Sequence, residues 1–136
     1  MIDCENVVYN TVAVALRTEF SGIFVSGENV AAPSSYPAAT LVEMDNSVYE
    51  QSMDSSSTEN HAVVMYQAEA YSNKTTGRKT EAKAIMANID ATMASLGFVR
   101  LSKSPMPNTS PLIYRIVARY RAVIGKDNEN YLSYRK

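Results

Sequence analysis

The chain has 136 residues, 46% of them hydrophobic, and a formal net charge of −1 at pH 7. These values predict a single globular domain over residues 1–136, and they argue against bulk electrostatic capture of nucleic acid, which needs a clustered basic surface. No apolar run approaches the roughly 20 residues that span a bilayer, and the acidic N-terminus lacks the positive charge of a secretory signal. We therefore predict an intracellular protein that contacts no membrane.

Residues 3–20 are predicted to form the first helix, because their apolar residues fall on one helical stripe. The helix ends at Ser21-Gly22, since glycine adopts the left-handed conformation of a helix end at little steric cost. A short apolar strand at residues 23–25 and a proline-containing connection at residues 26–37 follow. The β-prone residues 38–44 predict a second strand that ends in a turn at Asp45-Asn46.

The most polar stretch runs from residue 45 to residue 60 and contains no basic residue. We predict a long, mobile, acidic loop, because connections of this length without internal structure are often functional or disordered. The alternative is a solvated hairpin tip whose acids only maintain solubility. The acids of this stretch are Asp45, Glu50, Asp54 and Glu59.

Two stretches alternate in the way that half-buried strands do. In residues 61–71 the even-numbered residues, which include Tyr66, are predicted to face the core. Residues 112–124 repeat the pattern, with Tyr114 and Tyr120 on the core side and a basic row on the other side. Both stretches are therefore predicted to be long strands of the same sheet.

A second amphipathic helix is predicted to begin near Thr80 and to end at Gly97. Phe98-Val99 then begins another strand, and residues 104–111, which contain three prolines, form a loop. A short last strand is predicted at residues 131–134. Because three consecutive strands lack intervening helices, the sequence predicts the α+β class: a single mixed, mostly antiparallel sheet with two helices packed on one face, in the order α-β-β-β-α-β-β.

Few residues suggest chemistry. The lone cysteine, Cys4, cannot form a disulfide within the chain, and a single histidine gives it no zinc-binding partners. His61 has no nucleophile at a recognisable spacing. Residues 76–80 echo the Gly-Lys-Thr of a nucleotide-binding loop but lack its upstream glycine. We predict no enzyme activity, no cofactor and no metal.

The arginines of the basic strand admit two interpretations. Together with Lys74, Arg78 and Lys79 they could form a basic patch that binds a phosphate backbone. Alternatively they pair with Glu69 and Glu43, if those acids lie on neighbouring strands, since opposite charges across strands stabilise a sheet. Tyrosines interleaved with arginines suit either a subunit interface or an ordinary sheet core.

A set of short motifs resembles a known family: Tyr71-Ser-Asn-Lys74, Gly77-Arg-Lys-Thr80, the helix end Leu96-Gly-Phe98, the Pro107-Asn108 loop, and the strand from Tyr114-Arg115 to Arg119-Tyr120. Together they are similar to minor structural proteins of long-tailed phages and prophages, in the tail terminator (tail completion) or head-tail joining group. The resemblance covers residues 66–124, and its motifs belong to the scaffold and are not catalytic signatures.

The resemblance implies a virion assembly protein, made in the host bacterial cytoplasm. A tail terminator would form a homo-oligomeric ring, a hexamer in this family, that caps the tail tube protein and joins it to the head-tail connector. DNA would pass through the lumen without specific binding. The alternatives are a head-tail connector (neck) protein of the same virion and a small nucleic-acid-binding module.

Ring assembly requires that one surface of a subunit complement a different surface of its neighbour. The acid-bearing surfaces and the arginine row are the candidates for subunit or tube contacts. These residues are Glu43, Asp45, Glu50, Asp54, Glu59, Glu69, Arg115, Arg119 and Arg121. The acidic loop would either face the lumen and repel DNA or become ordered on meeting the tube or connector.

Overall fold

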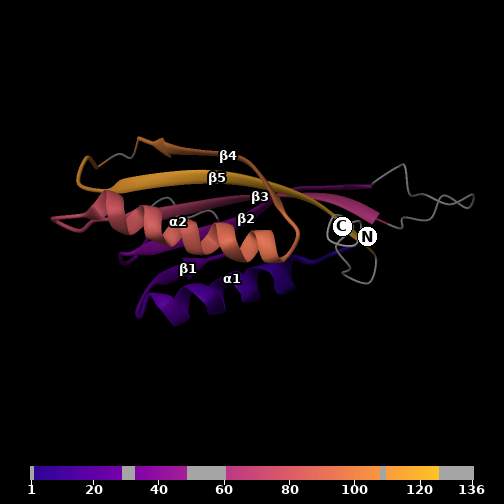
Figure 1. Ribbon diagram of the computed structural model, residues 1–136, viewed down its shortest axis with the longest axis horizontal. Helices are drawn as coiled ribbons and strands as arrows, with labels where there is room; N and C mark the ends of the chain where they lie inside the picture. The colour runs from indigo at the N-terminus through magenta and orange to yellow at the C-terminus, as the bar shows by residue number, and fades with distance from the viewer. Residues whose placement is uncertain (1, 29–32, 49–60, 108–109, 126–136) are drawn as a thin grey trace, which may run out of the picture.

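The computed structural model describes residues 2–28, 33–48, 61–107 and 110–125 (Figure 1). The elements of these residues are α1 (Glu5–Glu19), β1 (Phe24–Ser26), β2 (Ala38–Val48), β3 (His61–Ser72), α2 (Arg78–Ser95), β4 (Val99–Met106) and β5 (Tyr114–Gly125). The α+β class and the predicted element order are confirmed.

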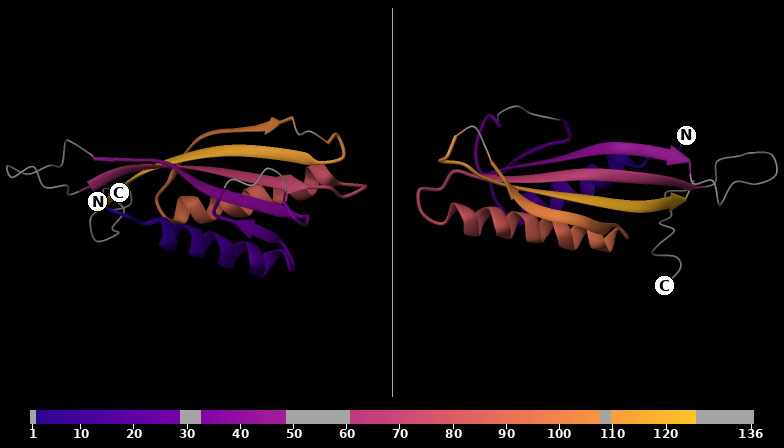
Figure 2. Two further views of the ribbon diagram at one scale, coloured as in Figure 1. Left: turned by 180° about the vertical axis from the view of Figure 1, so that it is seen from behind. Right: turned by 90° about the horizontal axis from the view of Figure 1, so that it is seen from above.

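The described strands form one mixed sheet in the order β1-β2-β3-β5-β4. β1 pairs with β2 in parallel, and the other neighbouring strands are antiparallel. β3 and β5 pair along their whole length, from His61 opposite Gly125 to Ser72 opposite Tyr114. Both helices lie on one face of the sheet, and no helix of the described chain covers the other (Figure 2). We call these the core face and the outer face.

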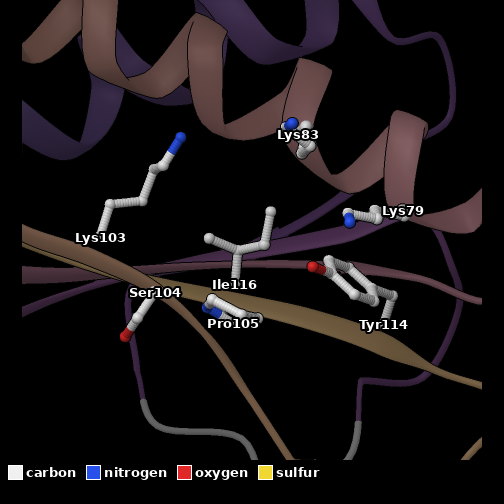
Figure 3. A pocket seen from close by; sticks show the side chains of 7 residues that line it. All are labelled: Lys79, Lys83, Lys103, Ser104, Pro105, Tyr114 and Ile116. Atoms are coloured by element: carbon white, nitrogen blue, oxygen red, sulfur yellow. The ribbon is translucent and has the colours of Figure 1, made fainter.

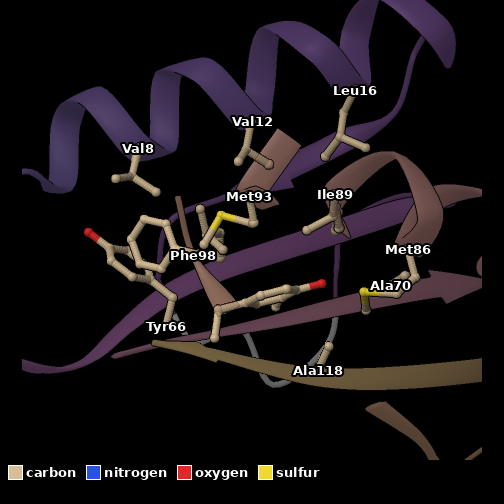
Figure 4. Close-up of a cluster of buried hydrophobic side chains, with 14 of the residues drawn as sticks. Val8, Val12, Leu16, Tyr66, Ala70, Met86, Ile89, Met93, Phe98 and Ala118 are labelled. Carbon is tan, nitrogen blue, oxygen red and sulfur yellow. The ribbon is translucent and has the colours of Figure 1, made fainter. Parts of the chain in front are cut away.

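The core lies between the core face and the two helices (Figure 4). Tyr66 and Tyr120 are its largest buried side chains and lie opposite each other in the pairing of β3 with β5. Ala68 and Ala118 are also opposite each other, and their small side chains leave room for α2 to approach the sheet. The helices contribute one apolar stripe each, which includes Val8, Val12 and Leu16 of α1 and Ile85, Ile89 and Met93 of α2.

The end of α2 sets the course of the chain into β4. Gly97 has a φ of +89°, a conformation that side chains with a Cβ rarely adopt. The N–H of Gly97 donates to Ala94 O and that of Phe98 to Met93 O, each at 2.9 Å. This pair of hydrogen bonds is a Schellman motif. It places the Phe98 ring in the core, edge-on to Tyr66, and confirms the predicted stop at Leu-Gly-Phe.

The predicted turn at Asp45-Asn46 is wrong, because β2 continues through both residues to Val48. A bulge between Glu43 and Asp45 lets the strand continue past these turn-prone residues. The side-chain amide of Asn46 donates to Ile2 O at 2.7 Å, which ties it to the chain before α1. The predicted acidic loop was therefore wrong for residues 45–48, and its remainder, 49–60, lies outside the described residues.

The predicted loop at residues 104–111 is also partly wrong, since β4 extends to Met106. Pro105 is compatible with a strand here because β4 is an edge strand, where a missing N–H need not break the ladder. β5 begins at Tyr114, two residues after the predicted start at 112. The strand predicted at residues 131–134 lies outside the described residues.

Candidate assembly surface

The centre of the outer face carries apolar side chains that are only partly buried. The strand pairing places Val42 of β2, Val63 and Met65 of β3, and Val117 of β5 on this side of the sheet. We call these four residues the outer apolar patch. In the register, Gln67 and Arg119 separate Val117 from Met65 and Val63, and β3 separates it from Val42. Because partly exposed apolar side chains on a sheet face can mark contact with another molecule, this patch is a candidate docking surface.

One end of the outer face is closed by a network around Glu69, whose residue surface is 5% exposed. Arg115 Nε donates to Glu69 Oε1 at 2.6 Å, and Nη2 forms an ion pair with the same oxygen. The hydroxyl of Tyr71 donates to Oε1 at 3.1 Å and that of Thr40 to Oε2 at 3.4 Å. A buried carboxylate is tolerated when such donors replace its water. The network therefore holds β2, β3 and β5 together.

Aromatic side chains cover this network. Tyr36, in the connection before β2, meets Tyr71 edge-on with ring centroids 6.4 Å apart. The Arg115 guanidinium lies 5.9 Å from the centre of the Tyr71 ring and also donates to Pro107 O at 3.4 Å. Burial, followed by the negative charge of Glu69, raises the pKa of Tyr71 to about 12. Arg115 is thus committed to contacts within its own chain.

The other two arginines of β5 are in a different situation. Arg119 Nε donates to the side-chain oxygen of Gln67 at 3.1 Å, and no acid of the described chain forms an ion pair with Arg119 or Arg121. Arg121 lies between Met65 and Val99 in the register of the sheet. The outer apolar patch is therefore bordered by two cationic side chains without an ionic partner among the described residues.

Glu69 and Glu43 were both predicted to pair with arginines of β5, and only Glu69 does so, with Arg115. The expectation for Glu43 is wrong because β3 lies between β2 and β5. Glu43 pairs in register with Tyr66, on the core side of the sheet. Burial, then the charges of Glu5 and Asp3, raise the pKa of Glu43.

The remaining predicted contact residues are scattered. Asp45 is exposed in β2 after the bulge and faces outward opposite Met65, away from Glu43. Glu50, Asp54 and Glu59 lie outside the described residues. The predicted acidic set is therefore not gathered into one surface by the described part of the chain.

A concave region lies between the first turns of α2 and strands β4 and β5 (Figure 3). Its volume is about 230 Å³, and we call it the lysine cavity. Its floor is apolar, and three lysines from two elements line its rim. The lining residues are Lys79, Lys83, Lys103, Ser104, Pro105, Tyr114 and Ile116. No acid of the described chain pairs with any of the three lysines.

The sequence interpretation had included Lys79 among nearby cations but missed Lys83 and Lys103. These two residues are 20 positions apart in the chain, on a helix and an edge strand, so no local pattern joins them. The available signal was the overall distribution of charge along the chain, which is markedly uneven.

The β4 edge of the sheet is exposed along all eight residues of the strand, including the apolar Val99, Leu101 and Met106. Three features oppose pairing with a further strand. The register shifts between Arg100 and Ser102, Lys103 adds a charge, and Pro105 lacks an N–H. These features disfavour the addition of a further strand at β4.

His61, the one histidine, is the first residue of β3 and lies opposite Gly125. It does not line the lysine cavity. Over the same residues, no cluster of three or more His, Cys, Asp or Glu side chains has the geometry to hold a metal ion. Neither α1 nor α2 has the length and apolar character needed to cross a membrane.

Comparison with known proteins returned no matching family model and no similar curated protein. The class that the fold defines is a small α+β domain in which two helices cover one face of the sheet and no helix of the described residues covers the other.

Proposed function

We propose that this chain is a phage virion assembly protein, a tail terminator that forms a ring on the tail tube and joins it to the head connector. The outer apolar patch carries the proposal. A protein whose role is to contact other subunits needs a preformed surface of this kind, whereas an enzyme needs a pocket with converging reactive groups.

The composition of the outer face supports protein contact. Apolar side chains at the centre with arginines beside them are typical of interfaces, where Arg and Met are enriched and Lys is depleted. Arg119 and Arg121 lack an ionic partner within the described chain, so an acid on another protein can pair with them. The rigid Glu69 network next to the patch fixes the strands that present it.

The test is binding to the tail tube protein of the same virion, viewed by negative-stain microscopy. The unmodified protein is expected to form rings at tube ends. Val63→Glu introduces a charge into the outer apolar patch at a partly exposed position opposite Ser47 and Val123, away from Glu69, and is expected to abolish this binding, with circular dichroism to check that the variant folds. Val14→Glu, the same exchange at an exposed site on α1, is the matched control and should bind. A protein that stays monomeric with tube present contradicts the proposal.

The two alternative functions predict different outcomes in binding experiments. A head-tail connector would bind the head side of the virion and leave the tube unoccupied. The second candidate is a nucleic-acid-binding module, favoured by Arg119 and Arg121, which have no ionic partner among the described residues. Such a module would bind DNA with an affinity that falls steeply with salt and drops on replacing these two arginines. Absence of DNA binding at low salt removes that candidate.

A further inference from the structure

The charges of this chain are divided between its two halves. Ten of the 14 acidic residues lie within residues 1–72, together with a single basic residue, Arg17. The other 12 of the 13 basic residues follow residue 72. The net charge of −1 therefore hides an acidic first half and a basic second half.

The sheet topology turns this division into a separation in space. The first half contributes α1, β1, β2 and β3, and the second half contributes α2, β4 and β5. With the strand order β1-β2-β3-β5-β4, the acidic half lies toward the β1 edge and the basic half toward the β4 edge (Figure 1). Among the described residues, the acids of the first half and the bases of the second half therefore lie toward opposite sides of the sheet.

On the basic side, the lysine cavity collects positive charge with no ion-pair partner among the described residues. Lys79 and Lys83 reach it from α2 and Lys103 from β4 (Figure 3). The first turn of α2 also contains Arg78, so cations stand where the helix dipole disfavours them. The acid of this turn, Glu81, is already engaged by Ser72 at 2.6 Å and Lys74 at 3.6 Å. An anion from outside the chain would relieve this repulsion.

On the acidic side, a cavity of about 400 Å³ lies between the first half of α1 and strands β1 and β2. Glu5 and Glu28 line it beside the ring of Tyr9, whose hydroxyl donates to Val25 O at 3.2 Å. No ion pair within the described chain neutralises either acid. We call Glu5 and Glu28 the acidic corner.

We propose that the acidic corner of one copy of this chain binds the lysine cavity of a second copy, in a head-to-tail contact. This inference rests on the proposed ring function, since a ring needs two different, complementary surfaces on each subunit. The opposite charges on opposite sides of the sheet supply such a pair. They leave the outer apolar patch free for the tail tube, and they require no pairing of β4 edges.

Charge complementarity of this kind also directs association. A copy that approaches with like-charged sides together is repelled, and one that approaches head-to-tail is attracted. Exposed charges are screened over roughly 8 Å at physiological salt. The contact is therefore expected to weaken as salt concentration rises.

The test is charge reversal on each side, with self-association followed by sedimentation velocity at low salt. Lys83→Glu/Lys103→Glu and Glu5→Lys/Glu28→Lys are each expected to weaken self-association at least about tenfold. An equimolar mixture of the two variants is expected to associate again, because each now offers the charge that the other lacks. Arg17→Glu, a reversal outside both surfaces, is the control and should associate normally, and circular dichroism melting checks that each variant folds.

The possible outcomes distinguish a failure of the head-to-tail contact from a failure of the proposed ring function. Rings that persist unchanged in both reversal variants overturn the head-to-tail contact and leave the ring function standing. Charge-dependent association into open chains that never close supports the contact and overturns the ring. Wild-type protein that is monomeric at all concentrations overturns the contact, as does a lysine cavity that binds pyrophosphate or DNA while the mixture of variants stays monomeric.

Discussion

The Glu69 network and the lysine cavity place charges on the same sheet in opposite ways. Glu69 is buried and receives hydrogen bonds from Arg115, Tyr71 and Thr40. The lysines of the cavity are exposed and have no ionic partner in the described chain. The first arrangement stabilises the fold, whereas the second includes Lys79 in the first turn of α2, where the helix dipole disfavours a cation. Charges retained at such a cost to stability are candidates for function.

The largest effect is expected from breaking the buried network. Glu69→Gln leaves Arg115 without its counter-charge at a partly buried site, and the free energy of unfolding is expected to fall by about 3 kcal/mol. Urea denaturation followed by circular dichroism measures this change. Lys83→Gln is the matched removal of a charge at the lysine cavity, with an expected effect below about 0.5 kcal/mol. Equal losses in the two variants would contradict the distinction between the two regions.

A smaller effect is expected at alkaline pH. The folded pKa of Tyr71 is raised to about 12 from its usual 10, so the neutral hydroxyl is favoured in the fold. Its contribution is fully present below about pH 10 and is lost as the pH rises through about 12. Tyr71→Phe is expected to lose part of this alkaline decline in the free energy of unfolding. If the free energy of unfolding of that variant declines with pH as in the wild type, ionisation of the Tyr71 hydroxyl does not cause the decline and the prediction is contradicted.

A modest gain in stability is expected at the start of α2. Lys79→Gln removes a cation from the positive end of the helix dipole and should raise the free energy of unfolding by about 0.3–0.5 kcal/mol at low salt. The same variant is expected to weaken self-association. Thermal melts at low and high salt measure the first effect, and its disappearance at high salt is the internal control. A loss of stability would show that Lys79 supports the fold.

The smallest effect is expected at Glu43. Its folded pKa is raised above the usual 4.5, so protonation favours the fold, and the ionised form is disfavoured at neutral pH. Its stabilising contribution is complete below about pH 4.5 and is lost as the pH rises through the raised value. Glu43→Gln is therefore expected to raise the melting temperature slightly at pH 7 and not at pH 4. A gain of the same size at both pH values would point to packing instead of charge.

Much of the fold was predictable because it depends on local patterns. The alternation in residues 61–71 and the apolar stripe of the second helix identified their buried faces, and Gly97 marked the helix end. The errors came at Asp45-Asn46 and Pro105. Turn-forming and strand-breaking residues there lie within strands, because a bulge and an edge position accommodate them.

The candidate surfaces were less predictable. The prediction that Glu69 pairs with an arginine of β5 was correct, because a long alternating strand has only two neighbours and β5 is one of those of β3. The same prediction for Glu43 was wrong, because β3 lies between β2 and β5, and this strand order cannot be derived from local sequence patterns. The lysine cavity was missed because α2 and β4 meet only when both pack against the sheet.

The sequence by itself determined the order of the secondary elements and most of their extents, the buried faces of the long strands and helices, and the unequal division of charge between the two halves of the chain. These are properties of neighbouring residues and of composition, which act before any long-range contact forms. The tertiary structure alone decided that β3 and β5 pair side by side and that hydrogen-bond donors surround the buried carboxylate of Glu69. It also decided that Lys79, Lys83 and Lys103 line the same cavity. The physical reason is that strand order is set by packing of the whole sheet against both helices, and this order carries the separated charges to opposite sides of the domain.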